Sequence, residues 1–419
     1  MTSKRRHSGS GIGEGQLGRI DRLTLDRPAD GGSAVGKEPS GRVVFADGGL
    51  AGETVRVALT TAKKTFARGQ VIEVLDASPD RCEPSCSTHA RGCGGCDLAH
   101  CSGTAQLEIK RHVVRDALTR IGRLDPDHVD NALDEGAGVA HTSIPGRYRT
   151  TVRMAIDRGR LSYRKRASHD TVHPEECTVV HPQLEELIRD ARFRPGAGTE
   201  AVVRVSAHSG EAVIAIDGDP AAVDASTDVQ IVKSGIDGVG TITEAVSGRL
   251  FQVSANSFFQ AGPEVASALV DAVGGAVGTI AGRSLIDAYA GVGLFAGTVG
   301  VGARSVIAVE QSTSACGDAE QNLPDPSTTI INSSVEQFHG EPADVVIADP
   351  SRAGLGQGGV DVLAPRALER LVLVSCDTGS LGRDANLLAA VGFELESVQV
   401  VDAFHNTSHV EVVAAFLPR

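Results

Sequence analysis

The sequence predicts an α/β protein with an N-terminal β-barrel, a central α+β region and a C-terminal Rossmann-like domain. Three observations predict this order: short alternating strands early in the chain, a cysteine-rich stretch followed by more strands, and a late strand–loop–helix repeat. At 419 residues the chain is long enough to form more than one hydrophobic core. We place the domains at 12–78, 79–250 and 251–419.

The first domain, 12–78, alternates apolar and polar side chains over short runs broken by Gly and Asp. Examples are 41–45, 53–57 and 70–75. Short strands at close spacing are typical of a small OB-like barrel. The segment 63–69 (KKTFARG) sets cations beside an aromatic ring, a pattern that suits a nucleic-acid contact.

Charge is unevenly distributed along the chain. The formal net charge is −13 at pH 7, which argues against a nucleic-acid partner for the molecule as a whole. Residues 147–166 nevertheless carry eight Arg and Lys against one Asp, and a local basic surface is enough to neutralise phosphates. A solvated sheet face with ordinary arginines is the competing interpretation. With no Trp and three Tyr, a large base-stacking platform is not expected.

Nothing in the sequence predicts export or a membrane. No segment approaches the roughly 20 apolar residues of a membrane span. Residues 1–9 start basic but lack the apolar core of a signal peptide, so we expect a flexible tail on a cytoplasmic protein. In that compartment cysteines serve as ligands or nucleophiles rather than in disulfides.

The central region is expected to be strand-rich, with an amphipathic helix over 106–121. Two acidic stretches rich in Gly, Ala and Asp, 124–140 and 217–238, read as surface connections.

From residue 251 the pattern changes to strand, glycine loop and helix, repeated. Four apolar runs end at polar or nucleophilic residues, which are Asp287, Glu310, Asp349 and Cys376. Strands alternating with helices build a parallel sheet that is covered on both faces. Side chains at the carboxyl ends of such strands face the ligand crevice.

The glycine loop after the first of these strands indicates a cofactor. Glu310 lies 23 positions after Asp287, which suits an acidic residue binding a ribose diol. Glycines at 291, 293 and 297 miss the G-x-G-x-x-G dinucleotide pattern by one residue. The acidic Asp287 favours the cationic donor S-adenosylmethionine over a nicotinamide cofactor. The alternative to a cofactor site is a glycine loop that only connects a strand to a helix.

Cysteines cluster at the start of the central region. Five of them lie within twenty residues: Cys82, Cys86, Cys93, Cys96 and Cys101. Cys93 and Cys96 flank two glycines in a tight chelating turn, and Cys177 stands alone downstream. Four thiolates fit either zinc or an iron–sulfur cluster, and the spacing does not separate the two. Cys316, in a helical stretch, is expected to pack in the core.

Cys376 follows a predicted buried strand and is a candidate nucleophile. A thiol with a nearby base suits covalent addition to an electron-poor ring. Residues 404–411 (FHNTSHVE) bring His405, His409 and Glu411 to the same C-terminal region. The alternative is that Cys376 is a buried thiol that only packs in the core.

Together these motifs resemble the RNA uridine-5-methyltransferases, particularly bacterial members with an N-terminal TRAM domain and a four-iron cluster. The similarity spans nearly the whole chain, including 84–100 (PSCSTHARGCGGCDLAH), 251–260 (FQVSANSFFQ) and 349–354 (DPSRAG). The resemblance implies a class I methyltransferase domain, a TRAM barrel that binds RNA, and a central RNA-binding iron–sulfur domain. It also implies methyl transfer from S-adenosylmethionine to C5 of a uridine, through a covalent cysteine–C6 adduct.

The resemblance also assigns residues. A [4Fe–4S] cluster would be held by Cys86, Cys93, Cys96 and Cys177. The donor site would be lined by Gln260, Tyr289, Leu294, Glu310, Ser334 and Asp349. Cys376 would be the nucleophile and Glu411 the general base, while Gln260 and Arg352 would contact the uracil. His405 and His409 are alternative bases that we expect to be structural or substrate-positioning.

Some positions depart from the family pattern. Six residues separate Cys86 from Cys93, slightly more than usual, so Cys82 could compete as a ligand. Cys101 has no role in the pattern. Asp377-Thr378 stands where Asn-Pro is commoner, and Ser351 replaces a Pro or Ala. None of these changes removes a chemically necessary group.

The resemblance favours 23S rRNA as the substrate, because members with both barrel and cluster tend to act on large-subunit RNA. Transfer RNA is the alternative, and neither a membrane nor an obligate protein partner is expected. Two other classes compete: an iron–sulfur oxidoreductase using a nicotinamide, and a non-catalytic RNA-binding module. The oxidoreductase would leave Cys376, Gln260 and Glu411 without a role.

Overall fold

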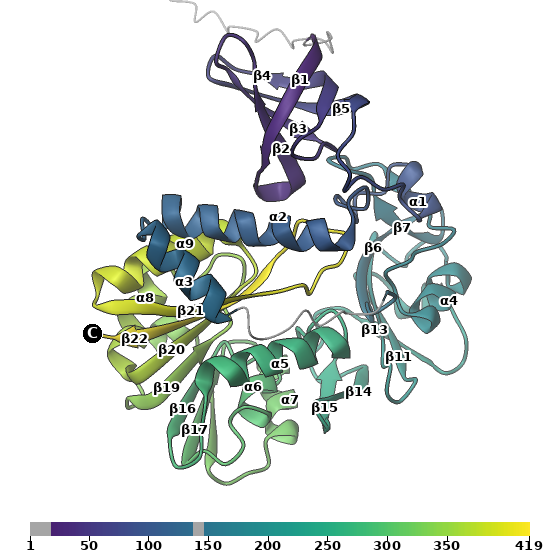
Figure 1. The fold of residues 1–419 in the computed structure, drawn as a ribbon. Coiled ribbons are helices and arrows are strands. Elements are labelled where there is room, and N and C mark those ends of the chain that lie inside the picture. Colours follow the sequence, from purple (N-terminus) through teal and green to yellow (C-terminus); the bar gives the residue numbers. More distant parts are fainter. Residues whose placement is uncertain (1–17, 137–145) are drawn as a thin grey trace, which may run out of the picture. The chain divides into compact units, whose positions relative to one another are not determined.

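The computed structural model describes residues 18–136 and 146–419 (Figure 1). The chain divides into two compact units, which we call the barrel unit and the main unit. The barrel unit contains Met1–Cys82 and His100–Ser102, and the main unit contains Glu83–Ala99 and Gly103–Arg419. The tail expected over 1–9 lies outside the described residues.

The barrel unit contains a closed five-stranded barrel with strand order β1-β2-β3-β5-β4, as the alternating pattern predicts. Its strands are β1 (Arg19–Pro28), β2 (Ser33–Lys37), β3 (Val43–Asp47), β4 (Thr54–Ala62) and β5 (Phe66–Asp76). Leu25, Val44 and Val55 fill its interior. The buried Glu53 carboxylate is paired with Arg81, which fixes the exit of the chain from the barrel.

The main unit contains a six-stranded sheet of order β13-β11-β10-β6-β7-β8. These strands are β6 (Thr151–Asp157), β7 (Arg160–Arg164), β8 (Thr171–Val172), β10 (Glu200–Val205), β11 (Ala212–Ile216) and β13 (Val229–Lys233). Helix α4 (Pro182–Asp190) packs on this sheet through Leu184 and Ile188. The prediction that 217–238 is only a surface connection is wrong, because the alternating run within it forms edge strand β13 beside β11.

The C-terminal sheet has seven strands in the order β18-β17-β16-β19-β20-β22-β21. They are β16 (Ser284–Ala288), β17 (Ser305–Glu310), β18 (Thr328–Asn332), β19 (Ala343–Ala348), β20 (Ala367–Ser375), β21 (Phe393–Val401) and β22 (Glu411–Pro418). The first five strands in this order, β18 to β20, are parallel to one another. Strand β22 lies between β20 and β21 and is antiparallel to both. The Rossmann-like domain expected from the strand–loop–helix repeat is confirmed.

Helices cover both faces of this sheet (Figure 1). One face packs against α5 (Pro263–Val277), α6 (Leu294–Gly297) and α7 (Thr313–Asn322). The other packs against α2 (Gly103–Asp116), α3 (Pro126–Gly136), α8 (Gly356–Leu363) and α9 (Thr378–Ala390). The helix expected over 106–121 is therefore present as α2 and a following π-helical turn, and it belongs to the core of the C-terminal sheet.

The connection predicted over 124–140 is wrong where the structure describes it, because α3 occupies most of it. Val129, Ala132 and Leu133 form one buried helical face in an otherwise acidic sequence. Gly136 lets the end of α3 approach the backbone of β21: a Cβ there would lie 1.9 Å from the Val398 carbonyl oxygen. Residues 137–140 of that prediction lie outside the described part of the chain.

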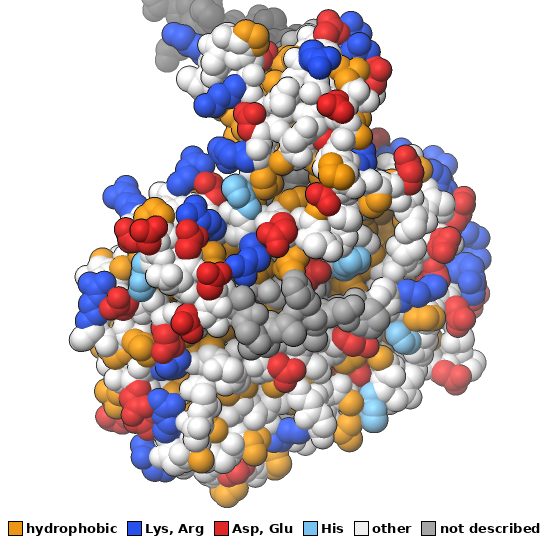
Figure 2. Space-filling model, viewed as in Figure 1, with side chains coloured by type: hydrophobic (Ala, Val, Ile, Leu, Met, Phe, Trp, Pro, Cys, Tyr) orange, Lys and Arg blue, Asp and Glu red, His pale blue; other side chains and the backbone are white. Residues whose placement is uncertain are grey.

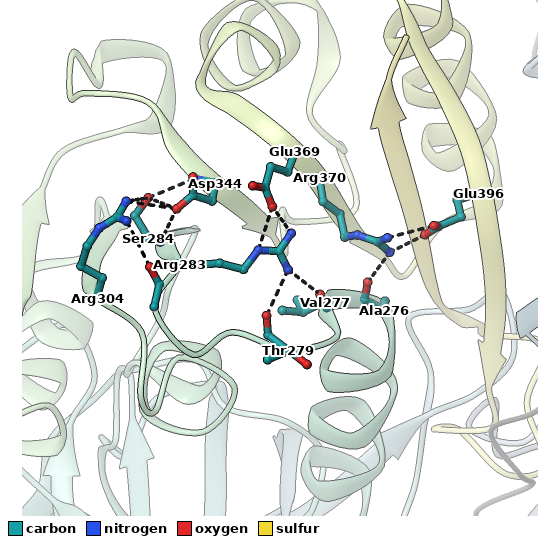
Figure 3. A network of polar contacts seen from close by, with 11 residues as sticks. Ala276, Val277, Thr279, Arg283, Ser284, Arg304, Asp344, Glu369, Arg370 and Glu396 are labelled. Carbon is teal, nitrogen blue, oxygen red and sulfur yellow. Dashed lines mark hydrogen bonds and ion pairs between the residues drawn. The ribbon is translucent and has the colours of Figure 1, made fainter.

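Ion pairs fasten the amino-terminal edge of the C-terminal sheet (Figure 3). The Asp344 carboxylate near the start of β19 accepts hydrogen bonds from the Ser284 backbone N–H at 2.7 Å and from Arg304 at 3.1 Å. In the same network Arg370 is paired bidentately with Glu396. These contacts join β16, β19, β20 and β21 at one edge, and leave the opposite, carboxyl-terminal edge for the polar residues described next.

Candidate active site and cysteine cavity

Three acidic residues meet at the carboxyl-terminal edge of adjacent strands. Asp287 and Glu310 lie in β16 and β17, and Asp349 directly follows β19. The parallel register pairs Ala288 with both Val309 and Ala348, so the three acidic positions flank one point of the sheet. Such an edge is where open α/β sheets bind ligands.

Glu310 orients the glycine loop. Its two carboxylate oxygens accept hydrogen bonds from the Gly291 N–H at 2.9 Å and the Ser312 N–H at 2.7 Å. Each oxygen keeps a further lone pair, so a fixed carboxylate can also accept from ligand hydroxyls. The loop itself uses left-handed backbone at Tyr289 (φ 63°) and Gly293 (φ 88°), and a non-glycine residue in that region is a strained position of the kind found at ligand sites.

Asp287 carries a buried polar atom without a partner. The residue is fully buried, and its Oδ2 accepts from the Ala296 N–H at 2.8 Å, while Oδ1 has no hydrogen-bond partner in the part of the chain that is described. Desolvation raises the pKa of Asp287 to about 7, with Asp349 and Glu310 contributing by charge. Desolvation also raises the pKa of Asp349 to about 7, although Asp349 keeps some solvent-accessible surface. A cationic ligand would stabilise the ionised forms of these neighbouring carboxylates and lower their pKa values.

The remaining predicted donor-site residues lie on the same edge or in a neighbouring loop. Tyr289 follows β16, the buried Leu294 opens α6, and Ser334 precedes a short 3₁₀ turn after β18. Gln260 is buried and lies beyond the β14–β15 hairpin (Thr241–Val246 and Arg249–Ser254), at the end of the 251–260 segment.

Three buried polar residues anchor the 251–260 segment, and no sequence pattern predicts their role. Arg204, in β10, donates to the Ser254 carbonyl at 2.9 Å and to the Ser257 carbonyl at 2.8 Å. Asp318 accepts from the Ser254 N–H at 2.8 Å and from its hydroxyl at 2.6 Å. These bonds hold the backbone that leads to Gln260.

Asn322 ties the same segment to the glycine loop. Its side-chain amide donates to the Gln252 and Val292 carbonyl oxygens, both at 3.0 Å, and its oxygen accepts from the Gln252 N–H at 2.8 Å. The 251–260 segment and the glycine loop therefore share one buried side chain. Phe258 in this segment is 72% exposed, an unusual position for an aromatic ring beside a buried motif.

Cys376 and Glu411 lie at the same end of two neighbouring antiparallel strands. Ser375 pairs with Val412 at the end of the β20–β22 ladder, so the next step of the register sets Cys376 opposite Glu411. Desolvation, followed by the charges of Glu411 and Asp349, raises the pKa of the Cys376 thiol to about 11, while Arg352 lowers it. Desolvation and Asp349 also raise the pKa of the buried Glu411 well above its usual value, and Arg352 again opposes the shift. The structure thus brings the predicted nucleophile, base and arginine together.

The two candidate histidines have different surroundings. His405 Nδ1 lies 3.7 Å from the Asp402 carboxylate. His409 lies at the surface, yet desolvation by the protein packed against it, followed by the charge of Arg352, lowers its pKa. A neutral His409 near Arg352 keeps an acceptor nitrogen available at neutral pH.

The residue after the nucleophile begins helix α9. The Asp377 carboxylate accepts the Ser380 N–H at 2.7 Å, which is an N-cap contact. Asn and Asp are equivalent caps, and Thr378 takes the first helical position where Pro would also fit. The departure from Asn-Pro therefore preserves the helix start beside Cys376.

The four predicted metal-ligating cysteines line one cavity. Cys86, Cys93, Cys96 and Cys177 surround a volume of about 190 Å³, together with Tyr163 and Thr407. Desolvation and then the other three thiols raise the pKa of Cys96 to about 12. Within residues 18–136 and 146–419, no three His, Cys, Asp or Glu side chains converge as ligands of a single metal ion.

Cys82 and Cys101 belong to the barrel unit, and the buried Cys316 donates to the Glu310 carbonyl, as core packing predicts.

The basic stretch 147–166 is partly neutralised. Arg147 is paired with Glu185, and Arg153 Nη1 lies 2.6 Å from Glu200. On the face drawn in Figure 2, basic and acidic side chains are interspersed rather than gathered by sign. In the barrel unit, Lys63 lies 5.3 Å from the Phe66 ring centroid, and Arg68 lies 4.9 Å from that of Phe45, so cations do accompany aromatic rings there.

The protein has a methyltransferase fold. Three features define this class: the order of the strands, the antiparallel strand β22 inserted between β20 and β21, and the acidic residues at the carboxyl-terminal edge. The same fold occurs in the crystal structure of a Pyrococcus abyssi tRNA (uracil-54, C5)-methyltransferase in complex with S-adenosyl-L-homocysteine. The match has a TM-score of 0.69 at 21% identity, and covers 94% of this chain and 99% of the other.

Sequence relatives define the family more closely. Residues 15–72 match the TRAM domain model. The chain is 30% identical to an uncharacterized RNA methyltransferase of Corynebacterium glutamicum, covering 96% of this chain and 98% of the relative. It is 32% identical to one of Corynebacterium efficiens, covering 96% of each. The chain belongs to this family of RNA methyltransferases, and the nicotinamide oxidoreductase alternative is left without support.

Among the described residues, no helix is both long enough and apolar enough to cross a membrane.

Proposed function

We propose that the protein methylates C5 of a uridine in structured RNA, with Cys376 as nucleophile, Glu411 as general base and S-adenosylmethionine as donor. The observation that carries the proposal is that Cys376 and Glu411 lie together at the sheet edge that also holds Asp287, Glu310 and Asp349, with the charge of Glu411 acting on the Cys376 thiol. Family membership supplies the reaction class, and the paired thiol and carboxyl supply the chemistry that C5 of a pyrimidine needs.

Cys376 activates the ring. C5 of uracil is a weak nucleophile, and addition of the Cys376 thiolate at C6 moves electron density onto C5 and the O4 oxygen. The thiol is neutral in the empty site, so it must lose its proton as the substrate binds. Arg352 stabilises the thiolate and the enolate oxygen because it is the cation whose charge lowers the pKa of Cys376.

Glu411 completes the reaction. S-adenosylmethionine, when bound, supplies a methyl group on a positively charged sulfur, and C5 takes that group. The C5 proton then passes to the Glu411 carboxylate, the C6–S bond breaks, and Cys376 leaves with the bonding electron pair as a thiolate. Glu411 must be ionised for this step, and the positive charge of Arg352 favours that form.

The residues of the donor site fit S-adenosylmethionine. The unpartnered Oδ1 of Asp287 and the raised pKa of Asp349 indicate carboxyls that gain from a nearby cation. Glu310, fixed by two backbone N–H groups, is placed to accept from a ribose diol. Tyr289, Leu294, Ser334 and Gln260 would complete the lining.

The cysteine cavity suits a [4Fe–4S] cluster held by Cys86, Cys93, Cys96 and Cys177. A single zinc ion bonds thiolates at about 2.3 Å, which would draw all four sulfurs close together. A cubane takes four cysteine thiolates as ligands, and four cysteines line this one cavity. When bound, the cluster would tie Cys177 to the segment around Cys93.

The RNA partner is proposed to be 23S rRNA, with transfer RNA as the alternative. The TRAM barrel and the basic positions of 147–166 would contact the RNA backbone, which helps to offset the few kcal/mol needed to flip a uridine out of its stack.

The decisive experiment is methyl transfer from labelled S-adenosylmethionine to total RNA from cells that lack this protein, followed by mapping of 5-methyluridine. Wild-type protein should label one large-subunit ribosomal uridine, and Cys376→Ala should give neither label nor a denaturation-resistant protein–RNA complex. Label in transfer RNA would keep the chemistry and change the substrate. Methylation by Cys376→Ala at the wild-type rate would refute the covalent mechanism.

A further inference from the structure

The loop that leads to Glu411 is held by side chains from far earlier in the chain. This loop, residues 402–410, connects β21 to strand β22, which carries Glu411. At its far end, the Asp97 carboxylate accepts from the Ser408 N–H at 2.8 Å and from the Ser408 hydroxyl at 2.5 Å. Two bonds from one carboxylate to one residue fix the loop three positions before Glu411.

The middle of the loop is clamped by Gln106, on α2. This side chain is 1% exposed; its Oε1 accepts from the Asn406 N–H at 2.8 Å and its Nε2 donates to Asn406 Oδ1 at 3.1 Å. Asn406 has φ 65°, in the left-handed region, and the Leu98 N–H donates to its carbonyl at 3.0 Å. All these bonds stabilise one strained residue.

Lys110, one turn further along α2, holds the start of the loop. Its side chain is fully buried, and Nζ donates to Asp402 Oδ1 at 2.5 Å and to the Phe404 carbonyl at 2.9 Å. Desolvation opposes ionisation of Asp402, but His405 and Lys110 hold its pKa at about 2. A buried ammonium with two fixed acceptors allows little freedom to the backbone that carries them.

The same loop also borders the cysteine cavity. Thr407 lines the cavity together with Cys93 and Cys96, and Asp97 directly follows Cys96 in the chain. Asp97 therefore links the cavity wall at Cys96 directly to Ser408.

We propose that Asp97, Gln106 and Lys110 are positioning residues that aim the Glu411 carboxylate at the C5 proton. The cysteine cavity, through Asp97 and Thr407, determines how firmly they do so. The inference rests on the proposed function, since it assigns Glu411 the proton-removal step. It predicts that loosening the loop impairs that step and leaves thiol addition by Cys376, on the separate strand β20, intact.

The test is to trap the methylated covalent intermediate. Wild type, Asp97→Ala, Gln106→Ala and Glu411→Gln are incubated with methyl-labelled S-adenosylmethionine and total RNA from cells that lack the protein. Label in a denaturation-resistant protein–RNA complex is then measured. Both loop variants should accumulate the complex at least 10-fold over wild type, and so should Glu411→Gln. Asp134→Ala, which removes an exposed carboxylate on α3, is the matched control and should behave as wild type.

A second readout follows the loop itself. In Asp97→Ala, amide hydrogen exchange over 402–411 should rise at least 10-fold, with exchange in β20 unchanged. The same local rise is expected in Cys177→Ala, which lacks a cavity thiol distant in sequence from Asp97. Global loss of protection in Asp97→Ala, or unchanged exchange over 402–411, would overturn the inference.

The two hypotheses fail in different ways. If Cys376→Ala still methylates RNA, the proposed function fails. If Glu411→Gln traps the complex but Asp97→Ala and Gln106→Ala lose activity without trapping it, the positioning role fails and the proposed function stands.

Discussion

Cys376 and Glu411 lie opposite each other one step beyond the Ser375–Val412 pair of the β20–β22 ladder. Burial, followed by the charge of Glu411, raises the pKa of Cys376 to about 11, and burial, followed by the charge of Asp349, raises the pKa of Glu411 well above its usual value. Arg352 is the cation that opposes both shifts.

The rate of covalent complex formation should therefore rise with pH. The reactive form is the thiolate, and its population increases about 10-fold per unit while the pH stays below the pKa of Cys376. Between pH 7 and 9 we expect a continuous rise in single-turnover complex formation. Removing the charge in Arg352→Ala should shift the profile to higher pH, and Arg352→Lys should shift it less. A flat wild-type profile over that range would contradict a neutral resting thiol.

Donor affinity should depend on pH near neutrality. Asp287 and Asp349 have pKa values of about 7 in the empty site, so the ionised form that attracts a sulfonium grows as pH rises. For a carboxyl with that pKa, the ionised fraction rises about 10-fold between pH 6 and 8. Calorimetry should show S-adenosylmethionine binding more tightly over this range with proton release. S-adenosylhomocysteine, which lacks the positive charge, should show a shallower dependence, and Asp349→Asn should flatten both.

Much of the fold could be predicted from the sequence because its signals are local. Polar or nucleophilic residues follow apolar runs at Asp287, Asp349 and Cys376, and this repeat is enough to predict a parallel sheet. The helix α3 was missed because acidic and glycine-rich composition masked the helical spacing of Val129 and Leu133.

The partners of the site were harder to predict because they depend on long-range topology. Insertion of β22 between β20 and β21 is what sets Glu411 opposite Cys376, and no local pattern encodes that order. Gln106 and Asn406 are 300 positions apart, so their contact has no sequence signature. A single Arg204 within a strand likewise looks like any other surface arginine until its burial is seen.

Arg204→Met should weaken both stability and methyl transfer. The guanidinium is almost completely buried, and although desolvation lowers its pKa to about 10, it stays charged at pH 7 and donates to the Ser254 and Ser257 carbonyls. Leaving buried carbonyls without donors costs about 1–3 kcal/mol. Denaturant unfolding should show that loss, and the apparent donor affinity should fall because the path to Gln260 is released. Arg189→Met, which removes an exposed arginine from helix α4, should leave both quantities nearly unchanged.

Asp377→Ala should destabilise the start of α9 and slow the reaction at Cys376. The Asp377 carboxylate caps the helix through the Ser380 N–H, and loss of such a cap costs about 1 kcal/mol. The N-terminus of α9 also carries partial positive charge next to the nucleophile, which favours its thiolate. Fraying of the first turn should therefore move the pH profile of complex formation upward in addition to lowering the melting temperature. Asp377→Asn restores the residue commoner in the family, retains an acceptor for the cap and should match wild type in stability. If Asp377→Asn were as unstable as Asp377→Ala, the carboxylate charge would be what the helix start needs, and the hydrogen-bonded cap alone would not explain this position.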